Sequence, residues 1–166
     1  MNEIHQAILD ALRCVGAEKG IIYVTVPITT GLRELKLMHD LHLSRDELRR
    51  LHPDRWTTEV KRTNEADAKA FTTMVQLLNE DRVVLNPAEL QVETWSQDEY
   101  AAMWNDVLSQ FCEKLVLTPD WAFSRGARSE VQRMLLLKRP IVDIFGAPVS
   151  PESLKRADEE AVQRMT

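Results

Sequence analysis

Cysteine is scarce in this sequence, and a basic surplus is missing altogether. Only Cys14 and Cys112 are present, far apart and without a CxxC or Cys/His partner, which predicts reduced thiols of the kind found in a cytosol. The formal net charge of −5 argues against a large nucleic-acid interface, because contact with many phosphates requires a basic face. The composition therefore predicts no nucleic-acid polymer as a partner.

Long apolar runs are also missing. The longest uncharged run, Gly20–Leu32, is too short to cross a bilayer and is interrupted by Pro27. Glu3 and Asp10 fall where the apolar core of a signal peptide would lie. The sequence predicts a soluble, cytoplasmic protein with no membrane partner.

Several common catalytic and cofactor-binding motifs do not occur. The sequence holds no GxGxxG, GxxxxGK[ST], HExxH or GxSxG, so dinucleotide, P-loop, zincin and hydrolase-elbow sites lack support. No His follows Phe71, which disfavours a Ser or Cys nucleophile. His39 and His42 share the spacing of two metal ligands on a helix but have no third ligand at sensible spacing, so a solvated face is favoured. The residue pattern alone therefore gives no support to a metal site or a dinucleotide site.

A βαβ unit stands out in the second half of the chain. Within Leu115–Ile144, an apolar strand ends at Pro119, a small-residue turn opens a helix, and Ile141–Ile144 forms the next strand. This order implies a parallel sheet, whose ligands bind beyond the carboxyl ends of the strands and beside helix N-termini. At 166 residues the chain is expected to form one domain, 1–166.

The remaining elements extend this pattern. Ile21–Val26 is rich in β-branched residues and predicts the first, central strand, and Arg82–Leu85 predicts a short second strand. Helices are expected at 1–19 and 150–166 and at Leu32–Leu41, Ala68–Leu78 and after the capping boxes Ser44-x-x-Glu47 and Ser96-x-x-Glu99. The fold class is α/β: a Rossmann-like or flavodoxin-like, doubly wound, mostly parallel sheet of four to five strands with helices on both faces.

Residues 39–67 are expected to form a helical insertion rich in Arg and His. Its arginines, with Trp56, suggest either a lid that pairs with phosphate and stacks on a base or a charged surface helix with one packed Trp, and the surface helix is favoured. The arginines in question are Arg45, Arg49, Arg50 and Arg55.

Two carboxylates and a phenol form the candidate chemistry. Glu130 lies near the start of a helix, Glu113 directly precedes a strand, and Tyr23 lies on the first strand. Carboxylates beside an oxocarbenium-like centre can cleave a glycosidic bond, and Ser124 with Gly126 can hold a phosphate at a helix N-terminus. The alternative for Glu130 is a plain favourable interaction with the helix dipole, which the residue pattern alone favours.

Five segments together resemble the nucleoside 2-deoxyribosyltransferase superfamily. The segments are IYVTVPITTG (22–31), VVLNPAEL (83–90), CEKLVLTPDW (112–121), SRGARSE (124–130) and KRPI (138–141). The resemblance is greatest to a small-protein branch with a Pro-x-Trp-x-x-Ser-x-Gly-Ala-x-x-Glu signature, and the superfamily includes 2′-deoxynucleoside 5′-monophosphate N-hydrolases. It implies a Rossmann-like fold, a homodimer or higher homo-oligomer, and cleavage or transfer of the N-glycosidic bond of a nucleoside or nucleotide without a cofactor.

The resemblance also implies roles for individual residues. Glu130 matches the nucleophile that takes the sugar C1, Tyr23 the hydroxyl that orients it, and Glu113 the acid that assists the leaving base. Ser124, six residues before Glu130, matches a phosphate-binding Ser. Further contacts with the substrate are expected from Gly126, Arg125, Arg128, Trp121 and Pro27.

Three departures from the family pattern keep alternatives open, and one of them is Glu113 in place of the usual Asp. Val26 stands where a Gly commonly precedes Pro27, and Arg128 stands where the enzymes have a second small residue before Glu130. The expected function is an N-glycosidase acting on a nucleoside 5′-monophosphate. The alternatives are a non-catalytic nucleotide sensor and an interaction scaffold on the same fold.

Overall fold

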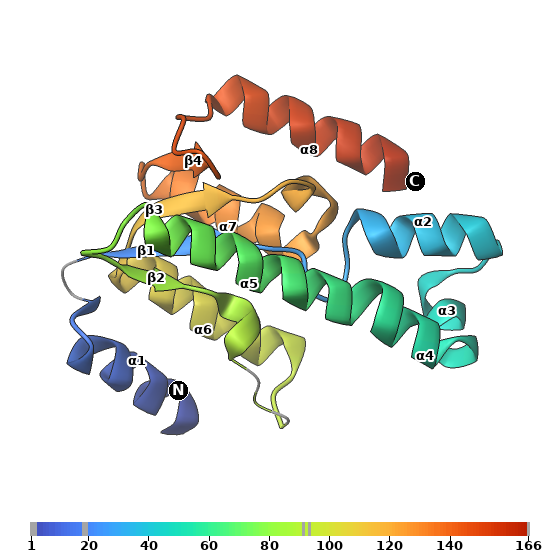
Figure 1. Ribbon diagram of the computed structural model, residues 1–166, viewed down its shortest axis with the longest axis horizontal. Coiled ribbons are helices and arrows are strands. Elements are labelled where there is room, and N and C mark those ends of the chain that lie inside the picture. The colour runs from blue at the N-terminus through green and yellow to red at the C-terminus, as the bar shows by residue number, and fades with distance from the viewer. Residues whose placement is uncertain (1–2, 18–19, 91, 93, 166) are drawn as a thin grey trace.

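The protein is built on a four-stranded parallel sheet, as the sequence predicts. The computed structural model describes residues 3–17, 20–90, 92 and 94–165. The strands lie in the order β2-β1-β3-β4, with helices on both faces (Figure 1). Their bounds are β1, Ile21–Thr25; β2, Val83–Leu85; β3, Cys112–Leu117; and β4, Ile141–Asp143. The expected α/β, doubly wound class is confirmed.

Strand β1 is the centre of the core. All five of its side chains are buried, which suits its run of β-branched residues because both faces of the strand are covered. Alternation sends Ile22 and Val24 into one apolar cluster, while Ile21 and Tyr23 join another on the opposite face. Thr25 shares the face of Tyr23, two positions away.

Four helices cover the Tyr23 face and one covers the other face. Leu9 of α1, Met103 of α6, Val131 of α7 and Leu154 of α8 belong to the same cluster as Tyr23. Ala68 and Val75 of α5 pack against the Ile22 face, and α5 crosses the front of the sheet in Figure 1. The helices span α1, Glu3–Cys14; α5, Arg62–Leu77; α6, Gln97–Gln110; α7, Arg125–Leu136; and α8, Pro151–Met165.

The remaining helices extend past the carboxyl ends of the strands (Figure 1). They are α2, Leu32–Leu41; α3, Arg45–Leu51; α4, Pro53–Arg55; and the π-helix η2, Trp56–Lys61, which runs directly into α5. The helix expected at Ala68–Leu78 begins earlier, because α5 starts at Arg62 and carries residues 62–67 within one long helix. Short 3-10 turns follow two strands: η3, Pro87–Glu89, and η4, Trp121–Phe123.

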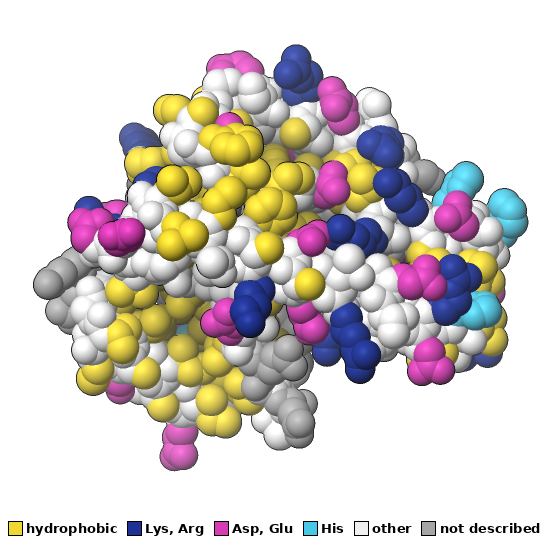
Figure 2. All heavy atoms as spheres, viewed as in Figure 1, with side chains coloured by type: hydrophobic (Ala, Val, Ile, Leu, Met, Phe, Trp, Pro, Cys, Tyr) yellow, Lys and Arg dark blue, Asp and Glu magenta, His cyan; other side chains and the backbone are white. Residues whose placement is uncertain are grey.

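The surface is divided by chemistry. Charged side chains gather over the helical extension, whereas apolar side chains gather between α5 and α8 (Figure 2). Phe145, two residues after the end of β4, is 78% exposed. Among the described residues, no helix combines the length and apolar character that a bilayer crossing requires.

The order of the strands locates the place where a ligand is expected. The chain leaves β1 toward β2 on one side and returns to β3 on the other side, so the topological switch point lies between β1 and β3. Open α/β sheets bind ligands at the carboxyl ends of the strands at this point. The loops that follow β1 and β3, and the N-terminus of α7, meet there.

Candidate functional site

Glu130 is bound by two hydroxyl groups of β1. The Tyr23 hydroxyl donates to Oε1 at 2.7 Å, and the Thr25 hydroxyl donates to Oε2. Both donors come from one face of the strand, because residues two apart project to the same side. The carboxylate is thereby fixed against the carboxyl-terminal half of the central strand.

Helix α7 carries Glu130 to this position. Ser124 caps the helix by accepting a hydrogen bond from the Ala127 N–H at 3.4 Å, and Ala127 and Val131 bury the helix face that packs on the sheet. Glu130 follows Ala127 by three residues and therefore lies close to the same face, one turn further along. The Ser124 cap and the apolar face of α7 together place Glu130 against β1.

The surroundings shift the titration of both partners. Burial raises the pKa of Glu130 above its ordinary value, and the hydrogen bonds from Thr25 and Tyr23 lower it, so desolvation is the larger effect. Burial and the neighbouring Glu130 carboxylate raise the pKa of the Tyr23 phenol well above its ordinary value. Tyr23 therefore stays protonated and remains a hydrogen-bond donor at any physiological pH.

An aromatic side chain from α6 supports Tyr23. The ring of Trp104 meets the Tyr23 ring edge to face, with centroids 5.7 Å apart. Tyr23 is fully buried and Trp104 is partly exposed. The phenol that binds Glu130 is thus held in one orientation by packing as well as by its hydrogen bond.

The expected phosphate-binding residues lie at the start of α7, with differing availability. Ser124 is buried, whereas Arg125 and Gly126 are exposed in the first turn, where backbone N–H groups lack helical acceptors. Arg128 instead turns toward α8, where its Nη1 lies 3.5 Å from Asp158 Oδ1. The structure therefore leaves Arg125 accessible to a phosphate and gives Arg128 an acidic partner.

Glu113 does not join this group. It lies at the amino end of β3, where Cys112 pairs with Ile21, whereas Thr25 pairs with Leu117. Four residues along a strand correspond to about 13 Å. Its carboxylate meets Arg82 instead, with Oε2 3.1 Å from Nη1. Glu113 is the second residue of β3, not the residue before the strand, and ligands in a parallel sheet collect at the other end, so its position does not fit the expected role beside Glu130.

Pro27 and Trp121 line two different pockets. Pro27 lines a pocket at the switch point, together with residues of α5 and the turn after β3, with a volume of about 160 Å³. Trp121 is 9% exposed and lines a second pocket between η4 and α8. Glu130 lines neither pocket.

The arginines and the Trp of the extension surround a buried acid. Glu34, with no exposed surface, accepts from Arg45 Nε at 2.9 Å, from Arg49 Nη2 at 2.9 Å and from Trp56 Nε1 at 3.1 Å. The guanidinium of Arg49 also stacks 4.7 Å from the Trp56 ring centroid. Arg49 and Trp56 are therefore structural clamps between α2, α3 and η2, and the lid interpretation lacks support from their contacts.

Sequence reasoning missed Thr25 and the polar residues of α5. Thr25 is the second donor to Glu130, and the alternation of β1 carried the signal, because Thr25 shares a face with Tyr23. Asn64 and Asp67 are held within the extension by Arg33, through contacts of 2.9 and 2.7 Å. No local pattern marked these residues, since their partner Arg33 lies 31 residues before Asn64 in the chain.

Over the described part of the chain, no group of three or more His, Cys, Asp or Glu side chains is placed to hold a metal ion. Comparisons with protein-family models, curated proteins and solved structures find no match to this chain.

Proposed function

We propose that the protein cleaves or transfers the N-glycosidic bond of a nucleoside 5′-monophosphate, with Glu130 as the nucleophile. The observation that supports this best is the pair of hydroxyl donors, Tyr23 and Thr25, that fix the Glu130 carboxylate near the switch point. A positioned carboxylate beside an anomeric carbon is what a covalent glycosidase mechanism requires. The resemblance in sequence to the deoxyribosyltransferase superfamily favours the same assignment.

The first step forms a covalent sugar ester. One carboxylate oxygen of ionised Glu130 bonds to C1 as the C1–N bond breaks, and the bonding electrons leave with the base nitrogen, which takes a proton from solvent. Tyr23 keeps its proton throughout and serves to orient the nucleophile. A carboxylate whose pKa burial has raised is more basic than an ordinary one, which suits a nucleophile.

The second step releases the sugar and restores Glu130. Water attacks C1, the ester bond to Glu130 breaks, and the carboxylate regains its electron pair while a proton passes to solvent. A second base in place of water makes the reaction a transfer. Ser124, the free N–H groups of the first turn of α7 and Arg125 hold the 5′-phosphate.

Chromatographic detection of free base tests the proposal. Wild-type protein, Glu130→Gln and the exposed control Glu159→Gln, whose partner Lys155 lies on the same helix, are incubated with ribo- and deoxynucleosides and their monophosphates. We expect base release by wild type and by Glu159→Gln, and a loss of at least 10³-fold in Glu130→Gln. Full turnover by Glu130→Gln would contradict the role of Glu130 as the nucleophile. Adding a second base to the reaction separates hydrolysis from transfer.

A nucleotide sensor is the second candidate, and one observation favours it. Glu130 is bound by both hydroxyls and lines neither of the two pockets described above, an arrangement that also suits a partly buried structural acid. A sensor predicts thermal stabilisation by a nucleotide that is recovered intact, and little loss of affinity in Glu130→Gln.

A further inference from the structure

A pocket lies at the switch point, on the side of the sheet that α5 covers. It lies where the loops after β1 and β3 meet α2 and α5, and its walls include Pro27, Phe71 and Pro119. Drug-sized ligands occupy pockets of roughly 300–1,000 Å³, so a pocket of about 160 Å³ suits a single ring system. Phe71 is partly buried and offers the aromatic wall.

The loop that forms one side of the pocket is held rigidly. Asn64 of α5 donates to the carbonyl oxygens of Ile28 and Thr30 at 2.9 and 3.0 Å. Gly31 has a φ of +105°, and a Cβ there would lie 2.9 Å from Pro27 Cβ, so the turn requires glycine. The pocket is thus shaped before any ligand arrives, which lowers the entropic cost of binding.

The charged residues of the pocket indicate whether its ligand is an anion or a group that donates hydrogen bonds. Among the described residues that line it, Arg33 is the one with a cationic side chain, and that guanidinium is engaged by Asp67 Oδ2 at 2.7 Å and by Asn64 Oδ1 at 2.9 Å. Asp120 adds a second carboxylate to the lining, so the acids outnumber the bases by one. An excess of negative charge disfavours phosphate and favours a ligand that presents N–H groups.

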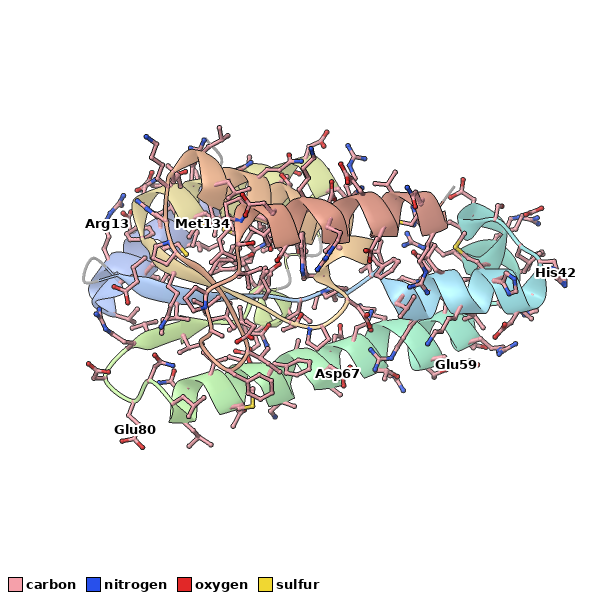
Figure 3. All side chains as sticks on the ribbon, turned by 90° about the horizontal axis from the view of Figure 1, so that it is seen from above. Arg13, His42, Glu59, Asp67, Glu80 and Met134 are labelled. Atoms are coloured by element: carbon pink, nitrogen blue, oxygen red, sulfur yellow. The ribbon has the colours of Figure 1, made fainter. Side chains whose placement is uncertain are left out.

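The pocket is joined to Glu130 through one residue. The Thr118 hydroxyl, in the lining, donates to the Thr25 carbonyl oxygen at 2.7 Å, and the Thr25 hydroxyl donates to Glu130. Val26, the next residue along the chain, also lines the pocket. Figure 3 shows Asp67 midway along the molecule, between His42 at the tip of the extension and Glu80 near the opposite end.

We infer that this pocket binds a planar, N–H-bearing aromatic heterocycle, the base of the substrate, stacked on Phe71 with Asp67 and Asp120 as acceptors. That this heterocycle is the base of a substrate rests on the proposed function. The binding of a heterocycle in this pocket does not. The assignment separates two subsites: the phosphate binds at the N-terminus of α7, and the base binds between α2, α5 and the turn after β3.

Binding of free bases tests the inference without any turnover, because a free base has no glycosidic bond to cleave. Titration calorimetry measures adenine, guanine and cytosine against wild type, Phe71→Leu and Asp67→Asn. 2-Deoxyribose 5-phosphate and inorganic phosphate serve as probes without a base. We expect each variant to weaken binding of the best base at least about fivefold, since stacking and charged acceptors each contribute that much, and to leave sugar-phosphate binding unchanged.

Asp81→Asn is the matched control, because Asp81 is 89% exposed and lies in the turn before the amino end of β2. It should bind every probe as wild type does. The inference is overturned if no base binds, if both variants bind base as tightly as wild type, or if they lose the sugar phosphate rather than the base. Base binding that depends on Phe71 and Asp67 in a protein without turnover would support the pocket and reject the glycosidase.

Discussion

The Tyr23 hydroxyl lies 2.7 Å from Oε1 of Glu130, across a sequence separation of 107 residues. One residue comes from the buried central strand and the other from the first half of the helix after β3. Thr25 completes the arrangement from the same strand face. The contact exists because the parallel order brings the chain back beside β1 before α7 begins.

Replacing Tyr23 with Phe should move the acid limb of the activity profile to higher pH. The hydrogen bond from Tyr23 favours the ionised form of Glu130, so its loss raises the pKa of that carboxyl further. Because the nucleophile must be ionised, kcat/KM should then require a more alkaline solution. The measurement is kcat/KM against pH for base release.

Tyr100→Phe is the matched control, because Tyr100 is the only other tyrosine and its hydroxyl bonds to the backbone of Val92. Its profile should match that of wild type. An unchanged acid limb in Tyr23→Phe would mean that Tyr23 does not tune the nucleophile.

The raised pKa of Glu130 should also make the free energy of unfolding depend on pH. Its pKa in the folded state is raised, so the folded protein holds this proton more tightly than the unfolded chain does. The free energy of unfolding should therefore fall, relative to Glu130→Gln, as pH rises from the ordinary carboxyl pKa through the raised one. Urea denaturation of both proteins across this range measures the difference. If the unfolding free energy of wild type stays constant or rises relative to that of Glu130→Gln over this range, the pKa of Glu130 is not raised.

Glu34→Gln should destabilise the protein strongly. The buried carboxylate accepts from two guanidinium groups and an indole, and removing its charge leaves Arg45 and Arg49 without an anionic partner. Loss of one partner of a buried ion pair typically costs about 3–5 kcal/mol, and the partial exposure of both arginines places the expected loss at or below the lower end of that range. Glu59→Gln, which breaks the exposed pair with Arg55, is the control and should change stability little. Equal losses of unfolding free energy in both variants would show that the buried Glu34 stabilises the protein no more than an exposed ion pair does.

The fold was predictable because local patterns and topology agree. The buried, β-branched β1 and the capping boxes at Ser44 and Ser96 each predicted the element that the structure contains. The match of Tyr23 with Glu130 was predictable only from a resemblance in sequence, since spacing cannot show a contact between distant segments. Glu113 was misplaced because its role was inferred from the resemblance alone, although a residue at the start of a strand lies at the amino edge of a parallel sheet, opposite the ligand edge.

Gly20→Ala tests the structural role of Glu113. Gly20 has a φ of +96°, and an added Cβ would overlap the Glu113 carboxylate and lie 3.0 Å from Glu113 Cβ, so strain and crowding combine. Gly16→Ala, at φ +83° in open space, carries the strain alone and should cost about 1 kcal/mol of stability. We expect a clearly larger loss for Gly20→Ala, measured by urea denaturation, and a partial recovery when Glu113→Ala is added. Glu113→Gln should keep full base release, and a large fall in its kcat would restore the acid to the reaction.

Ser124→Ala should weaken the reaction of a nucleoside monophosphate without affecting that of a nucleoside. The Ser124 hydroxyl accepts from the Ala127 N–H, which leaves its own hydrogen free to donate to a phosphate oxygen at the start of α7. Its removal should raise KM for the nucleoside monophosphate about tenfold, because a hydrogen bond to a charged group contributes about 1.5–3 kcal/mol, and should leave the nucleoside reaction unchanged. Loss of the cap itself costs about 1 kcal/mol of stability.

Ser44→Ala removes an equally long cap from α3, with 3.4 Å between Ser44 Oγ and the Glu47 nitrogen, and serves as the control for that loss. A rise in KM shared by nucleoside and monophosphate, or one reproduced by Ser44→Ala, would show that Ser124 acts only through the helix.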